Sequence, residues 1–243
     1  MSSYQLGGCK MKKILVINPV GTDKWDKKDE EYLKKFADRG TEIRVLSLKS
    51  GPKSIETFVS KAVVCNEIIG LTEQNKDQFD AIIINCFGDP CIEAARETSD
   101  IPVLGPGETS MHIACLLGHK FSVISPTRKT ALQVELNAKK IGLNDRLAAV
   151  IPLEISVLDL EKAPEKTVEI IVDKAKETIN KDGADVIVLG CTAIAYWAEE
   201  IQKKLNVPVI EPASTTLKVA EALVNLNLGV NKNCKRYRSD FHQ

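Results

Sequence analysis

Aromatic side chains and histidines are scarce in this sequence. Phe, Trp and Tyr make up 5% of its 243 residues, and only three residues are histidine. Haem pockets and histidine-rich metal sites are built from such side chains, so the chain offers little material for either. We therefore expect no metal site.

An excess of charge and a long apolar run are also missing. Lys and Arg together number 33, as do Asp and Glu, whereas nucleic-acid-binding domains usually carry a basic excess. The longest uncharged apolar stretch, residues 186–198, has 13 residues, and a membrane-spanning helix needs about 20. Residues 1–10 lack the apolar core of a signal peptide, and we interpret them as an extension. We expect neither a nucleic-acid nor a membrane partner.

Cysteine usage indicates a reducing compartment. The count of seven is odd, no CxxC pair occurs, and nothing indicates secretion. Reduced thiols in the cytoplasm fit this pattern best. We assign four of the seven to packing or to the surface: Cys65, Cys91, Cys115 and Cys234.

Short apolar runs alternate with stretches of helical periodicity. The runs cover residues 13–18, 43–48, 81–85, 121–125 and 186–190, with two shorter ones at 103–104 and 209–210. These runs are nearly all apolar and do not alternate, which is typical of strands buried on both faces, as in a parallel sheet covered by helices. The helical stretches are 29–38, 54–69, 129–140, 164–181 and 193–205. This alternation predicts an α/β fold with right-handed crossovers.

An internal repeat divides the chain. Residues 13–19, KILVINP, resemble residues 120–126, KFSVISP, 107 positions further on, and residues 80–86, DAIIINC, resemble residues 185–191, DVIVLGC, 105 positions further on. Two ordered matches with nearly equal offsets indicate a duplication. We predict two parallel-sheet α/β halves related by a pseudo-two-fold axis, 11–105 and 106–212. A last helix, about 213–228, would pack back on the first half, and 229–243 would be a tail.

Each half places a cysteine at the same point. Cys86 and Cys191 both follow a predicted strand directly. In open α/β sheets the ligand binds beyond the carboxyl ends of the strands, so facing halves would bring both thiols to one cleft. One thiolate and one thiol on opposite sides of a carbon can remove a proton from one face and deliver one to the other. Buried structural cysteines are the plainer explanation, but two equivalent positions make it less attractive.

The segments around these cysteines resemble the Asp/Glu/hydantoin racemase superfamily. The similar motifs are Asn18-Pro19, Asn85-Cys86-Phe87-Gly88-Asp89-Pro90, Leu189-Gly190-Cys191-Thr192-Ala193 and Glu211-Pro212. The resemblance runs from about residue 11 to 226 and is closest to the hydantoin and allantoin racemase branch. It implies two α/β halves with a catalytic cysteine from each, and no cofactor.

Residues beside the cysteines indicate how a substrate is held. Phe87 follows Cys86 where amino-acid racemases usually have Asn-Thr, and it would provide an apolar wall for a planar ring. Asn18 and Ser125 end equivalent strands, and each can bond a ring carbonyl or N–H or simply cap a turn. Thr192 can donate to substrate or thiolate, and Gly88 permits close approach of the backbone.

Three functions remain open. We expect a racemase acting on a small molecule, a 5-substituted hydantoin or an allantoin-like ring, with Cys86 and Cys191 as catalytic residues. Asn18, Phe87, Gly88, Ser125 and Thr192 would bind the substrate. An aspartate- or glutamate-type racemase and a two-lobed binding protein without chemistry are the alternatives. We expect the protein to form a homo-oligomer.

Overall fold

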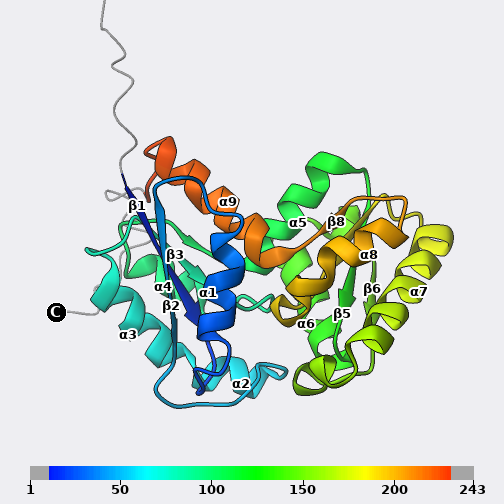
Figure 1. Cartoon of the computed structure of the whole chain (residues 1–243), viewed down its shortest axis with the longest axis horizontal. Helices are drawn as coiled ribbons and strands as arrows, with labels where there is room; N and C mark the ends of the chain where they lie inside the picture. The colour runs from blue at the N-terminus through cyan, green and yellow to red at the C-terminus, as the bar shows by residue number, and fades with distance from the viewer. Residues whose placement is uncertain (1–10, 231–243) are drawn as a thin grey trace, which may run out of the picture.

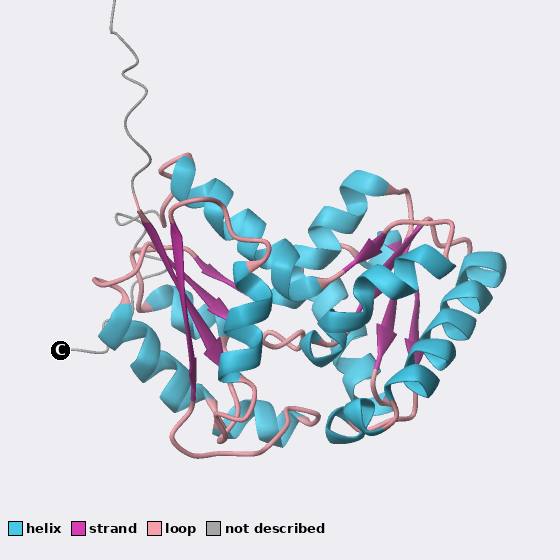
Figure 2. Cartoon of the chain, in the orientation of Figure 1, coloured by secondary structure: helices cyan, strands magenta, loops and turns pink. Residues whose placement is uncertain are grey.

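The structure, a computed structural model, describes residues 11–230, which form two α/β halves side by side (Figures 1 and 2). Each half has a four-stranded sheet in which every pair is parallel. The strand order is β2-β1-β3-β4 in the first half and β6-β5-β7-β8 in the second, so one topology occurs twice. The predicted fold class is confirmed.

In the first half, β1 and β3 form the middle of the sheet, where they are buried on both faces. Its elements are β1 (Lys12–Asn18), α1 (Asp26–Lys34), β2 (Thr41–Ser47), α2 (Phe58–Val63), α3 (Cys65–Asn75), β3 (Ala81–Ile84), α4 (Ile92–Glu97) and β4 (Val103–Leu104). The single helix predicted over 54–69 is two helices. Thr57 caps α2 through a capping box with Ser60, and the helices separate at Val64.

The second half repeats this plan. Its elements are α5 (Pro106–Leu117), β5 (Phe121–Ser125), α6 (Arg128–Lys140), η1 (Asn144–Arg146), β6 (Leu147–Pro152), η2 (Val157–Lys162), α7 (Pro164–Asp182), β7 (Val186–Leu189), η3 (Thr192–Trp197), α8 (Ala198–Lys204) and β8 (Val209–Ile210), followed by α9 (Pro212–Asn225). Strand β6 was not predicted. It lies at the sheet edge, all six of its residues are only half-buried, and its two alanines give a weak strand signal.

Each sheet is covered in part by a helix that follows the last strand of the other sheet. Met111 and Ala114 of α5, which follows the last strand of the first half, pack in the core of the second sheet. Leu217 and Ala220 of α9, which follows the last strand of the second half, pack against Ile14 and the rest of the first core. In Figure 1 the orange-red helix α9 accordingly lies over the first sheet.

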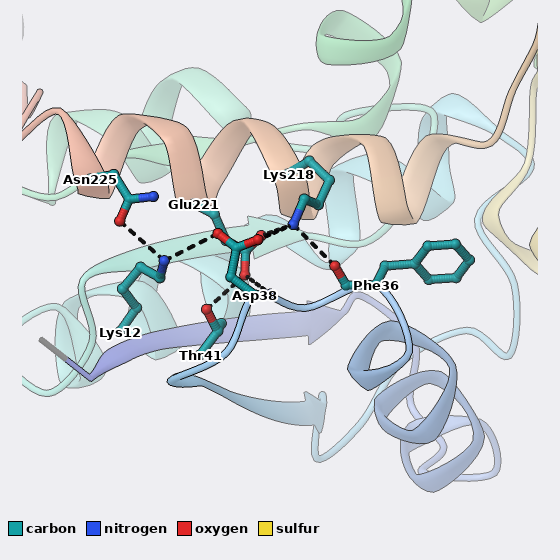
Figure 3. Close-up of polar contacts among 7 residues, drawn as sticks. All are labelled: Lys12, Phe36, Asp38, Thr41, Lys218, Glu221 and Asn225. Atoms are coloured by element: carbon teal, nitrogen blue, oxygen red, sulfur yellow. Dashed lines mark hydrogen bonds and ion pairs between the residues drawn. The ribbon is translucent and has the colours of Figure 1, made fainter. Parts of the chain in front are cut away.

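A polar network fixes α9 to the first half (Figure 3). Glu221, which is 1% exposed, accepts a hydrogen bond from the backbone N–H of Asp38 at 2.7 Å. Lys218 pairs with both Glu221 and Asp38, and Lys12 donates to Asp38 at 3.2 Å and to Asn225 at 3.0 Å. Buried charges are stable only when paired, and here the pairing ties α9 to the start of β1.

Candidate active site

A cavity lies between the two halves, at the carboxyl ends of their central strands. Its wall includes Cys86, two residues after β3, and Cys191, two residues after β7. Ligands of open α/β sheets bind beyond the carboxyl ends of the strands, and here two such ends meet at one cavity. The structure thus brings together the two cysteines that the repeat places at equivalent positions.

Four of the five predicted substrate-binding residues line the same cavity: Asn18, Phe87, Gly88 and Thr192. Ser125 does not. Its side chain is fully buried, and its Oγ donates a hydrogen bond to Oγ1 of Thr130 at 2.8 Å, so Thr130 lies on the wall in its place.

Sequence reasoning missed several other lining residues. The polar ones include Asp29, Asn85, Gln133 and Tyr196, and the apolar ones include Trp25, Ile55, Val134 and Val157. Asn85 could have been predicted from the sequence, because it is next to Cys86 at the end of a strand. The others come from α1, α6, η2, η3 and loops, whose positions relative to the cavity depend on tertiary packing.

Two asparagines and two aspartates form a chain of hydrogen bonds beside the cavity. Nδ2 of Asn18 donates to Oδ1 of Asp26 and to Oδ2 of Asp29, both at 2.9 Å. Oδ1 of Asn18 accepts from Nδ2 of Asn85 at 2.9 Å. The carboxylates are acceptors only, so they fix the orientation of the Asn18 amide and, through it, that of Asn85.

Helix α1 joins the halves along one side of the cavity. Tyr196 of η3 donates from its hydroxyl to Asp29, and Tyr32 donates to the carbonyl of Ala195 at 3.0 Å. Lys28 lies over the ring of Tyr196, 3.8 Å from its centroid, and pairs with Glu161 at 2.6 Å. Burial raises the pKa of Asp29 and of Tyr196 above their ordinary values. These contacts hold the two walls of the cavity together.

The loop that carries Cys86 is held by the start of α5. Asp89, in the left-handed region at φ 48°, accepts from the backbone N–H of Gly107 at 2.9 Å and of Glu108 at 2.6 Å. Burial raises the pKa of Asp89 to about 7, although these two donors oppose the rise. Nζ of Lys61 donates to the carbonyl of the neighbouring Gly88. The loop is therefore anchored at Gly88 and Asp89, the second and third residues after Cys86.

Both thiols are harder to ionise than a free cysteine. Burial raises the pKa of Cys86 to about 11 and that of Cys191 to about 12. In each half the backbone N–H two residues on, of Gly88 or Ala193, opposes the rise by bonding the sulfur. Near neutral pH both groups are almost entirely thiols, and the duplicated N–H gives each sulfur the same support once it loses its proton.

One pair of cysteines departs from the expectation of reduced thiols. Cys65 at the start of α3 and Cys91 before α4 are disulfide-bonded, with Cα atoms 5.4 Å apart. They had been assigned to packing or to the surface. Cys86, Cys115 and Cys191 are free, and Cys9 and Cys234 lie outside the described residues.

Residues 11–230 offer neither a metal-binding cluster nor a membrane-spanning helix. No three His, Cys, Asp or Glu side chains gather there in a way that could hold a metal ion. None of the helices in this range has both the length and the apolarity to cross a membrane.

Comparison with known proteins settles the family. A sequence profile described as Asp/Glu/Hydantoin racemase matches residues 14–220. The chain belongs to this family. It is therefore an isomerase, a racemase, and the resemblance inferred from the segments around Cys86 and Cys191 is confirmed.

Similar family members of known activity or structure cover nearly all of the chain. A hydantoin racemase from Pseudomonas sp. (strain NS671) is 34% identical over 221 residues, which are 90% of this chain and 89% of the relative. The crystal structure of allantoin racemase from Pseudomonas fluorescens is similar with a TM-score of 0.89 and 30% identity, over 94% of this chain and 97% of that one. A glutamate racemase from Francisella tularensis, 19% identical with a TM-score of 0.66, covers 92% of this chain and 85% of its own, and shares the fold.

Proposed function

We propose that this racemase inverts the carbon between a carbonyl and a ring nitrogen in a 5-substituted hydantoin or an allantoin-like ring, without a cofactor. One observation carries the proposal: Cys86 and Cys191, at equivalent positions of the duplicated fold, line one cavity. The similar hydantoin and allantoin racemases support the substrate class. The homo-oligomeric state and the cytoplasmic location stay predictions.

The mechanism uses the two thiols in turn. One cysteine, as thiolate, removes the proton from one face of the ring carbon, and the adjacent carbonyl delocalises the electron pair of the broken C–H bond. The other cysteine, as thiol, delivers its proton to the opposite face and becomes the thiolate. The pair then holds the same number of protons as before, so the reverse reaction uses the same groups in exchanged roles.

The cavity wall suits a neutral ring. Asp29 and Lys53 are the charged side chains among its lining residues in the described part of the chain, and Asp29 already accepts hydrogen bonds from Tyr196 and Asn18. Amide side chains and apolar ones make up much of the remainder. A ring of amide groups can exchange hydrogen bonds with amides, whereas a free amino acid needs partners for both a carboxylate and an ammonium group.

The substrate class is tested by following optical rotation. Single enantiomers of 5-substituted hydantoins, allantoin, aspartate and glutamate are incubated with the enzyme, and enzyme-free samples give the spontaneous rate. We expect the rotation of at least one ring compound to decay and that of the amino acids to persist. Decay for aspartate or glutamate alone would favour the amino-acid racemase, and no decay for any compound would favour a binding protein.

The raised thiol pKa values predict a steep pH dependence. The active form of the pair has lost one proton, and with the lower pKa near 11 this form makes up about 0.01% of the enzyme at pH 7. Its share grows about tenfold per pH unit until that pKa is approached. We expect kcat/KM for racemisation to rise about tenfold per unit between pH 6.5 and 8.5, after subtraction of the hydroxide-catalysed rate. A flat profile over this range would contradict the assignment.

A further inference from the structure

The side-chain carbonyl of Asn85 is an unsatisfied acceptor next to the reaction centre. Asn85 lines the cavity, immediately precedes Cys86 and is 7% exposed. Its Oδ1 is buried and has no hydrogen-bond partner. A buried acceptor without a donor is costly, so such a group in a binding cavity calls for a function.

The surrounding hydrogen bonds leave Asn85 no alternative orientation. Asp26 and Asp29 hold the NH₂ group of Asn18, so Oδ1 of Asn18 needs a donor. Nδ2 of Asn85 supplies it at 2.9 Å. Flipping the Asn85 amide would place two carbonyl oxygens against each other. The network therefore keeps the Asn85 carbonyl as the free end of the chain of hydrogen bonds.

The second half has no counterpart to this acceptor. The residue equivalent to Asn85 in the repeat is Gly190, which also lines the cavity. A Cβ atom there would lie 2.6 Å from the carbonyl oxygen of Ile124, so no side chain fits. The two thiols are placed symmetrically, but the recognition groups beside them are not.

We propose that Oδ1 of Asn85 accepts a hydrogen bond from the ring N–H adjacent to the reacting carbon, and that this bond selects cyclic amides carrying that N–H. This inference rests on the proposed function. Both enantiomers of a hydantoin have the same planar ring, so an acceptor on one side of the cavity can hold either enantiomer with its reacting carbon between the thiols. In a ring with an acceptor atom in place of the N–H, the partial negative charge of that atom would face the partial negative charge of Oδ1 of Asn85.

The test compares two rings that differ at one position. In a 5-substituted oxazolidine-2,4-dione, a ring oxygen replaces the N–H next to the reacting carbon with little change in shape. The preference is the kcat/KM for the hydantoin divided by that for the oxazolidinedione bearing the same substituent. We expect it to fall about 10- to 100-fold in Asn85→Ala, because the variant no longer distinguishes donor from acceptor. The intrinsic acidities of the two rings cancel in this comparison between enzymes.

A matched variant separates recognition from general disturbance. Asn75, 9% exposed and on α3, bonds the carbonyl of Leu71 and does not line the cavity, so Asn75→Ala should keep the wild-type preference. Asn85→Gly, which introduces the residue found at the equivalent position of the second half, serves if Asn85→Ala does not fold. If the preference for the hydantoin over the oxazolidinedione were unchanged in the Asn85 variants, the inference would be overturned. The proposed function would still be upheld in that case, because the variants racemise hydantoins.

Calorimetric binding of unsubstituted hydantoin and oxazolidine-2,4-dione gives a readout without turnover. For each protein the Kd of the dione is divided by the Kd of hydantoin. This ratio should be about 10- to 100-fold larger for wild type than for Asn85→Ala. Such a difference without racemisation of any hydantoin would uphold the role of Asn85 and reject the proposed function. Failure of wild type both to bind either ring and to racemise any hydantoin would overturn both.

Discussion

Replacement of Cys86 by serine is expected to slow racemisation about 10²- to 10⁴-fold in both directions, and replacement of Cys191 should do the same. Each direction needs one group as base and the other as acid, and a serine hydroxyl is a far weaker acid and base than a thiol near neutral pH. Initial rates from each pure enantiomer of the accepted hydantoin measure the effect. Cys115→Ser is the matched control, since Cys115 is a free, half-buried cysteine that does not line the cavity.

Hydrogen exchange with solvent distinguishes the two thiols. In deuterated water, the thiol left in each variant can still remove and return a proton on its own face of the ring. Cys86→Ser should therefore exchange the ring hydrogen of one enantiomer only, and Cys191→Ser that of the other, as read by mass spectrometry. Exchange of the same enantiomer by both variants would be incompatible with bases on opposite faces. Near wild-type racemisation by either variant would make that cysteine structural.

The duplicated sheet could be predicted from sequence because its central strands are buried on both faces. Strands β3 and β7 are wholly apolar, and β1 and β5 carry short apolar runs, so all four stand out from the helices around them. Edge strand β6 lacks this signature and was missed. Helix α5 was missed too, because it opens on Pro106 and Gly107, which resemble a loop.

The candidate site was predictable only where a residue's position follows from the strands themselves. Cys86, Cys191 and Asn18 come at strand ends, and the repeat alone places them at one edge of each sheet. Asp29 and Tyr196 reach the cavity from opposite halves and meet there, a contact that depends on how the halves pack and leaves no local pattern. Cys65 and Cys91 are 26 residues apart and join through the same kind of tertiary contact.

Gly107 is expected to be the glycine whose replacement does most damage to the site. A Cβ atom there would lie 2.2 Å from the carbonyl oxygen of Phe87 and 2.8 Å from Oδ2 of Asp89. The first of these atoms belongs to the backbone, and the second is held by the N–H groups at the start of α5. The Cys86 loop would therefore have to move away from α5.

We expect Gly107→Ala to lower the free energy of unfolding by about 3 kcal/mol, which corresponds to a fall in Tm of about 6–12 °C for a chain of this size. The displaced loop carries Cys86, so racemisation should fall more than tenfold even at temperatures where the variant is folded. Thermal unfolding followed by circular dichroism, with kcat measured well below Tm, separates the two effects.

Gly70→Ala is the control for this substitution. Gly70 lies within α3, and an added Cβ would meet nothing within 4 Å. Alanine favours the helix there by roughly 0.5–1 kcal/mol, so this variant should be slightly more stable than wild type and equally active. If Gly107→Ala matched it in both respects, the close contact between α5 and the Phe87 carbonyl would not be what positions Cys86.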